Sequence, residues 1–165
     1  MEYICIGKIV DTHGIKGELR IRSNFDKKDI VFKPGFIYYI GDDKIREEVV
    51  TYRHHKEFEM VTFKGYDNIN QVLKYIHLNV YVLRDDMKLG KDDYVLDELV
   101  NLEVIKDGKS LGIVREIVYN NSNVLLRISA IKDFYIPYNE YFIKRVDLLN
   151  KKIEVDNIEG LILWR

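Results

Sequence analysis

The chain has 165 residues, of which 47% are hydrophobic and 32% are charged, a balance that excludes an intrinsically disordered protein. Its 26 lysines and arginines nearly match its 27 aspartates and glutamates. No bulk positive field can therefore hold RNA, and any contact with RNA must be local. The twelve tyrosines and seven phenylalanines favour strands over helices.

The first half of the chain predicts strands separated by tight turns. Leu19 and Ile21 alternate with charged residues, the pattern of a half-buried strand. Strands are expected over residues 3–10, 18–22, 36–40, 45–52, 58–64 and 78–83. Asp67 can cap one short helix, whose apolar residues have helical spacing: Ile69, Val72, Leu73 and Ile76. Six strands and a short helix suit a small closed barrel.

A loop of five residues, His13 to Gly17, joins the first two expected strands. Gly14 and Gly17 are structural turn residues that allow positive φ twice and present Lys16 between them. The pair also fits the G-x-x-G loop of KH domains, but that loop joins two helices, whereas this one joins two strands. A small basic spot for RNA is one interpretation, and a tight turn with solvated charges is the other. Its candidate residues are His13, Lys16, Arg20 and Arg22.

A charged segment, residues 84–93, predicts a boundary between two domains. Residues 84–98 carry three basic and six acidic side chains, a net charge of −3. We expect an N-terminal barrel over 1–83, an acidic linker over 84–93 and a second mainly-β domain over 94–165. Its strands are expected at 102–106, 111–119, 124–129, 134–137 and 152–155, with a helical turn at 141–147 and an apolar terminal segment at 161–164.

Aromatic and aliphatic side chains meet negative charge directly after this segment, at Tyr94, Leu96, Asp97 and Glu98. Such a surface suits docking to a basic protein, because apolar burial supplies affinity and charge supplies steering. Packing between the two halves of the chain is the alternative interpretation.

No constellation for catalysis or metal binding is evident. His54 and His55 are neighbours on an expected strand and point to opposite faces, which makes a poor ligand pair. The single cysteine, Cys5, excludes a disulfide framework, and we expect it to be a small buried residue with an inert thiol. We therefore expect no enzyme, no metal and no cofactor. Without a signal peptide or an apolar spanning segment, a cytoplasmic protein is expected.

Taken together, these motifs resemble the bacterial RimM family of ribosome maturation factors. Similar segments run in family order along nearly the whole chain: residues 7–10, 12–21, 33–35, 94, 102–104, 111–114, 136–137, 146–147 and 159–161. The resemblance implies a barrel like that of translation factors, followed by a PRC-type β-barrel. It also implies a non-enzymatic chaperone of ribosome biogenesis. Such a factor binds the immature small-subunit head through a basic ribosomal protein, with adjacent rRNA a further contact, and supports processing of small-subunit rRNA.

The chain departs from the family pattern at three positions. Val95 stands where a second aromatic residue is usual, Asn101 replaces a glycine and Asn123 replaces an aspartate. The resemblance therefore implies partner contact for Tyr94 and only apolar packing for Val95. We expect a monomer. A sequence-tolerant RNA-binding barrel is the alternative function, and a barrel enzyme that uses His13 is a third.

Overall fold

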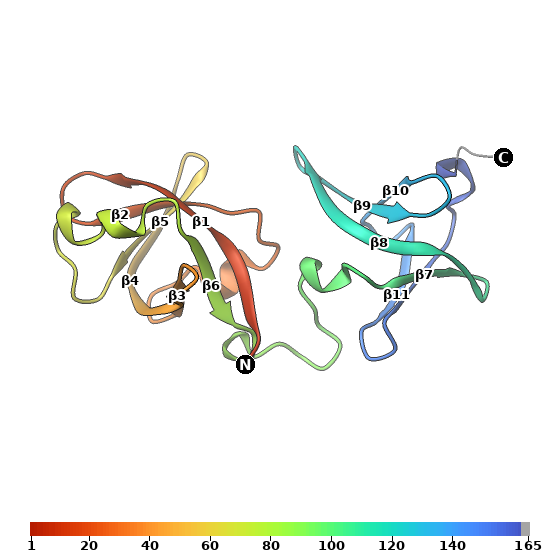
Figure 1. Cartoon of the computed structure of the whole chain (residues 1–165), viewed down its shortest axis with the longest axis horizontal. Coiled ribbons are helices and arrows are strands. Elements are labelled where there is room, and N and C mark those ends of the chain that lie inside the picture. Colours follow the sequence, from red (N-terminus) through yellow and green to blue (C-terminus); the bar gives the residue numbers. More distant parts are fainter. Residues whose placement is uncertain (163–165) are drawn as a thin grey trace. The chain divides into compact units, whose positions relative to one another are not determined.

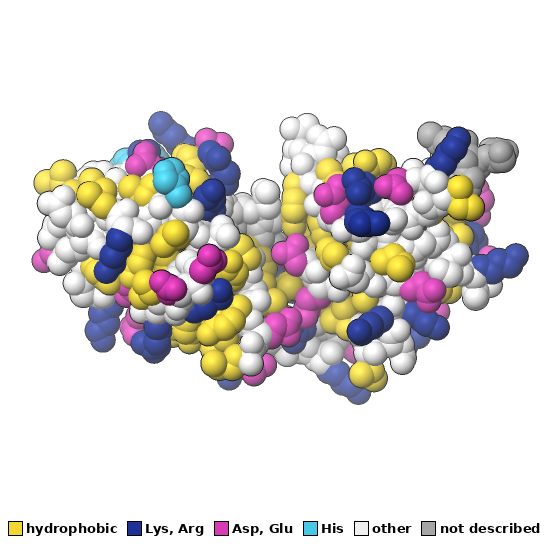
Figure 2. All heavy atoms as spheres, in the orientation of Figure 1, with side chains coloured by type: hydrophobic (Ala, Val, Ile, Leu, Met, Phe, Trp, Pro, Cys, Tyr) yellow, Lys and Arg dark blue, Asp and Glu magenta, His cyan; other side chains and the backbone are white. Residues whose placement is uncertain are grey.

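The computed structural model describes residues 1–162 and divides the chain into two compact units, Met1–Asp93 and Tyr94–Arg165. Each unit contains one six-stranded β-sheet (Figure 1). The predicted mainly-β class with one short α-helix is confirmed. Basic and acidic side chains alternate over the visible surface of each unit (Figure 2), in keeping with the balanced charge of the chain. No helix described between residues 1 and 162 is long and apolar enough to cross a membrane.

The sheet of the first unit closes into a barrel in the order β1-β2-β5-β4-β3-β6. All of its pairs are antiparallel. The strands are β1 (Tyr3–His13), β2 (Glu18–Arg22), β3 (Ile37–Ile40), β4 (Ile45–His55), β5 (Phe58–Phe63) and β6 (Asn79–Leu83). All six predicted strands of this half are therefore present, and β2 has the predicted bounds.

Alternating residues of these strands fill the barrel. Leu19 and Ile21 of β2 are fully buried, and their registers place them against Val61 of β5 and Ile9 of β1. Cys5 lies between the inward residues of β1 and is exposed, so the prediction of a buried thiol is wrong. Its thiol donates a weak hydrogen bond to the carbonyl oxygen of Gly7 at 3.6 Å.

The short α-helix is α1 (Lys28–Val31), and the predicted helix beginning at Asp67 is wrong. Two 3₁₀ turns, η1 (Ile69–Gln71) and η2 (Leu73–Tyr75), occupy that segment. Val72 and Tyr75 are both fully buried, three residues apart, which matches the period of a 3₁₀ helix. A backbone bond from Ile69 N to the Ile15 carbonyl oxygen, at 2.9 Å, ties the segment to the β1–β2 loop. Tertiary contacts therefore decide its geometry.

The second unit holds β7 (Glu103–Lys106), β8 (Lys109–Asn120), β9 (Asn123–Ser129), β10 (Phe134–Pro137), β11 (Ile143–Asp147) and β12 (Lys152–Val155). Their hydrogen-bonded order is β10-β9-β8-β7-β12-β11, and within the described residues this sheet does not close into a ring as the first one does. β12 and β7 pair in parallel, and the other pairs are antiparallel. The five predicted strands of this half are all present.

The predicted helical turn over residues 141–147 is wrong, because Ile143–Asp147 forms the edge strand β11. A bulge between Ile143 and Arg145 shifts its register against β12. Since the bulge adds one residue, Ile143 and Val146 lie three apart and imitate helical spacing. The predicted terminal segment 161–164 is described only through residue 162, after η5 (Glu159–Leu161), and its remainder lies outside the described residues.

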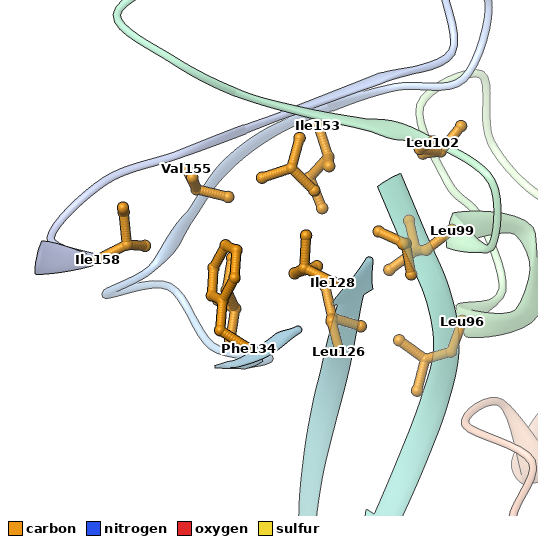
Figure 3. Close-up of a cluster of buried hydrophobic side chains, with 12 residues drawn as sticks. Leu96, Leu99, Leu102, Leu126, Ile128, Phe134, Ile153, Val155 and Ile158 are labelled. Carbon is orange, nitrogen blue, oxygen red and sulfur yellow. The ribbon is translucent and has the colours of Figure 1, made fainter. Parts of the chain in front are cut away.

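The core of the second unit is a single cluster of buried aliphatic side chains with one phenylalanine (Figure 3). It gathers residues from the β-strands and from the 3₁₀ turn η4 (Leu96–Leu99), which contacts β8. The labelled members are Leu96, Leu99, Leu102, Leu126, Ile128, Phe134, Ile153, Val155 and Ile158. The segment that follows Tyr94 is therefore an integral part of this core.

Candidate functional site

The 3₁₀ turn η4 sorts the side chains of the predicted docking segment into buried and exposed groups. Val95, Leu96 and Leu99 are at most 3% exposed, whereas Asp97 faces solvent. The Val95 N–H donates to the Glu98 carboxylate at 2.9 Å, which fixes the start of the turn. Leu96 is thus a core residue of this unit, and its contact with a partner stays a prediction. Val95 packs as an apolar residue.

Tyr94 is the aromatic side chain that remains at the surface of this segment. It is half-buried against the edge of the core, and its hydroxyl is hydrogen-bonded to the hydroxyl of Tyr138. Tyr138 follows β10, and its N–H donates to the Val124 carbonyl oxygen at 2.9 Å. The phenol of Tyr94 is therefore held by a residue that is itself fixed to the sheet, a preorganised arrangement suited to binding.

Residues 84–93, the predicted acidic linker, belong to the first compact unit. They begin with the 3₁₀ turn η3 (Arg84–Met87), in which Met87 is buried. Asp93 folds back, since its carboxylate accepts the N–H of Gly90 at 3.0 Å. Asp85, Asp92 and Asp93 are exposed and keep the segment acidic at its surface.

The β1–β2 loop has the predicted backbone, with φ of 68° at Gly14 and 94° at Gly17. Gly17 is buried against Asn68, and a Cβ at this position would lie 3.3 Å from the Asn68 carbonyl oxygen. Ile15 is 77% exposed, and Lys16 is exposed beside it. The loop therefore presents Lys16 to solvent, as its two glycines predict.

Of the four candidate RNA-binding residues, the structure brings three together. Arg20 donates to His13 Nδ1 at 2.8 Å, and the guanidinium groups of Arg20 and Arg22 lie 5.9 and 5.4 Å from the centre of the Phe58 ring. No contact between Lys16 and this group is present in the described part of the chain. The rings of His13 and His55 are 5.7 Å apart. Phe58 and His55 come from other strands, so only strand pairing reveals them.

Nearby charges form a network on the same strands. Arg53 makes a bidentate ion pair with Glu18, with both N···O distances at 2.8 Å, and this hydrogen bonding lowers the pKa of Glu18. His54 faces a different group, the nearly fully buried carboxylate of Glu59, at 3.0 Å. Tyr52 donates to that carboxylate at 2.6 Å. His54 and His55 thus serve separate clusters.

The described residues contain no cluster of side chains suited to bind a metal ion. No group of three or more His, Cys, Asp or Glu side chains in residues 1–162 is arranged to hold a metal ion. Tyr75 and Tyr66 donate to the buried carboxylate of Glu47, and burial together with these contacts raises the pKa of Tyr75 far above its ordinary value. The hydroxyls of Tyr66 and Tyr75 and the carboxylate of Glu47 are thus hydrogen-bonded to one another.

Two compact units, each with one six-stranded sheet, define a two-domain, mainly-β protein. Residues 4–87 match the family described as RimM N-terminal domain, and residues 96–161 match the RimM PRC barrel domain. The chain therefore belongs to the RimM family of non-enzymatic ribosome maturation factors. This confirms the resemblance carried by its motifs.

Curated relatives named "Ribosome maturation factor RimM" match along nearly their whole length. The protein of Oceanobacillus iheyensis is 40% identical over 164 residues, covering 95% of each chain. That of Ligilactobacillus salivarius is 38% identical over 168 residues, covering 98% of this chain and 99% of the relative. A crystal structure of a putative 16S ribosomal RNA processing protein RimM from Pseudomonas aeruginosa is 20% identical, with a TM-score of 0.43, covering 94% of this chain and 97% of its own.

Proposed function

We propose that this protein acts in maturation of the small ribosomal subunit by binding precursors of the subunit, and that it docks through Tyr94 on a basic protein of the head. The family assignment supports the first part, together with the full-length curated relatives that are named as ribosome maturation factors. The second part goes further than the family assignment, because it names the kind of partner and the residues that contact it. Its mechanism is binding without covalent chemistry.

The observation that carries the docking site is the state of Tyr94. Its side chain is half-buried, its hydroxyl is hydrogen-bonded to that of Tyr138, and the exposed residue Asp97 lies three positions along the chain. A fixed aromatic side chain loses little entropy on binding, and a neighbouring acid favours a basic partner. The contact set is therefore Tyr94 and Asp97, with Glu98 shaping the turn and Leu96 supporting it from the core.

The alternative function, a sequence-tolerant RNA-binding barrel, is favoured by the arginines that lie against Phe58 in the first unit. The two functions differ in what the protein binds. Docking on a ribosomal protein predicts that apolar and acidic side chains of the second unit dominate affinity. RNA binding alone predicts that basic side chains of the first unit dominate affinity, with strong salt dependence.

A pull-down of the tagged full-length protein from its host tests the proposal. Small-subunit precursors should be recovered together with a basic head protein. Treatment of the immobilised complex with ribonuclease should leave that protein bound, because the contact is between proteins. Recovery of RNA alone, or loss of every protein after ribonuclease, would contradict the docking site and favour the RNA-binding alternative.

A further inference from the structure

One face of the first barrel combines cations with an aromatic ring and takes no part in the proposed docking. We call it the basic-aromatic face and define it by His13, Arg20, Arg22, His55 and Phe58. These residues come from β1, β2, β4 and β5, which are neighbours in the barrel. On the side of the first unit that Figure 2 shows, histidine side chains lie beside Lys and Arg side chains.

The ring of Phe58 holds two guanidinium groups in place. The Cζ atoms of Arg20 and Arg22 lie 5.9 and 5.4 Å from its centre, within the range of cation–π attraction. The N–H groups of a guanidinium that are not bonded within the protein can donate hydrogen bonds to the oxygens of a phosphate group. The face is therefore organised before any ligand binds.

The arginines of this region differ in how their charge is used. Arg53 is neutralised by the bidentate pair with Glu18. Arg20 lies 3.8 Å from the carboxylate of Asp11 and also donates to His13. Arg22 is exposed, and within residues 1–162 it makes no ion pair with a carboxylate. Arg22 is therefore the cation whose charge is most available to a ligand.

Two histidines, His13 and His55, extend the face, and His55 makes it sensitive to protons. The ring of His55 lies 5.7 Å from that of His13, and the charged groups near it are Arg53, Lys56 and Arg20, with Glu18 tied to Arg53. Partial desolvation and these cations lower the pKa of His55. A bound anion would offset the repulsion and favour protonation of His55. Anion binding and proton uptake are therefore coupled here.

We propose that the basic-aromatic face binds the phosphate backbone of single-stranded RNA, with Arg22 as the main contact, Arg20 beside it, and His55 adding charge when protonated. This inference rests on the proposed function, because a protein that binds small-subunit precursors meets the precursor rRNA in them. It names the surface that would contact that RNA. RNA suits the face better than an acidic peptide does, because an unstacked base can pack on the exposed guanidinium planes and on Phe58.

Fluorescence anisotropy of the full-length protein with a labelled oligouridylate of about 12 nucleotides tests this site, a length within the usual site size of small barrels. Arg22→Gln should weaken binding about tenfold and lower the salt slope by about 1, as expected for one lost phosphate contact. Arg46→Gln is the matched control, because Arg46 is also an exposed arginine of this barrel. Equal affinities of the two variants, or no binding by the wild type, would overturn the site.

The histidine part has its own readout. Binding should strengthen as the pH falls from about 8 to about 5.5, through the range in which histidine gains its proton. The variant His55→Gln should flatten this dependence while the affinity at the higher pH changes little. An unchanged pH profile would refute the role of His55.

Failure of this site and failure of the proposed function give different results. If oligouridylate binding does not respond to Arg22→Gln while the wild-type protein still captures small-subunit precursors, only the RNA site is wrong. If the wild-type protein captures no precursors, the proposed function itself is wrong. Competition by polyglutamate as effective as competition by RNA would show that the face is a general anion surface and would contradict the RNA assignment.

Discussion

Replacing Gly112 with alanine should destabilise the second unit, because β9 passes too close to this position for a side chain. Gly112 has φ of 146°, and a Cβ there would lie 2.3 Å from the Ser129 carbonyl oxygen and 3.0 Å from Ile128 Cγ2. The β8–β9 pairing holds Ser129 opposite Ile113, so the strands themselves must shift. Backbone strain and overpacking each cost roughly 1 to 3 kcal/mol, so the free energy of unfolding should fall by about 3 kcal/mol.

Gly108→Ala separates the two costs. Gly108 also has positive φ, at 79°, but a Cβ there would meet no atom within 4 Å. Only the backbone cost applies at this turn, so Gly108→Ala should lower the stability of the same unit by about 1 kcal/mol.

Amide hydrogen exchange resolved by residue is the appropriate assay, since a chain with two compact units need not unfold in a single transition. Gly112→Ala should reduce the protection of amides in β8 and β9 and leave those of β1 and β2 unchanged. If the amides of the second unit are equally well protected from exchange in Gly112→Ala and in Gly108→Ala, the close approach of β9 does not constrain position 112.

Two further predictions concern side chains with assigned partners. Leu96→Ala should lower the stability of the second unit by about 2 to 5 kcal/mol, measured by urea denaturation, because Leu96 is a core residue; full stability with reduced partner binding would contradict this. The hydrogen bond from Arg53 lowers the pKa of Glu18. Their ion pair therefore stabilises the fold at pH values above the ordinary pKa of glutamate, and this stabilisation is lost as the pH falls through the lowered pKa. Arg53→Gln should therefore reduce the melting temperature at neutral pH and match the wild type in acid.

The alternation of residue types predicts the strands well. In Glu18–Arg22, apolar and charged residues alternate between two turns, and the strand has the predicted bounds. The charge and apolar pattern also identified both halves of the chain as mainly β. Local sequence is sufficient in these places because the two faces of each strand lie in different surroundings.

Local sequence fails where tertiary contacts change the period. Ile69–Tyr75 has helical spacing, but its bond to the β1–β2 loop and the burial of Tyr75 select two 3₁₀ turns. The β-bulge in Ile143–Asp147 likewise produces a three-residue spacing inside a strand. Both errors arise because one extra residue or one distant bond alters the local period, and neither is visible in sequence alone.

The sequence indicates only some residues of each candidate site, because the others come from distant strands. Tyr94 and Arg22 are recognisable from their own segments, but Tyr138 and Phe58 come from distant strands and are found only through pairing. Leu96 shows the opposite case, since an apolar residue in an acidic segment looks exposed until the 3₁₀ turn places it in the core. Spacing identifies the segment that carries a site, and the register decides which side chains reach it.

The most direct test of the docking proposal measures the affinity of full-length protein for purified small-subunit precursors. Tyr94→Ala should weaken binding by about 1 kcal/mol or more, as expected when an aromatic anchor is lost. Tyr135→Ala is the matched control, because Tyr135 is 46% exposed in the same unit and has no role in the site. Equal binding by the two variants would show that Tyr94 does not contact the partner.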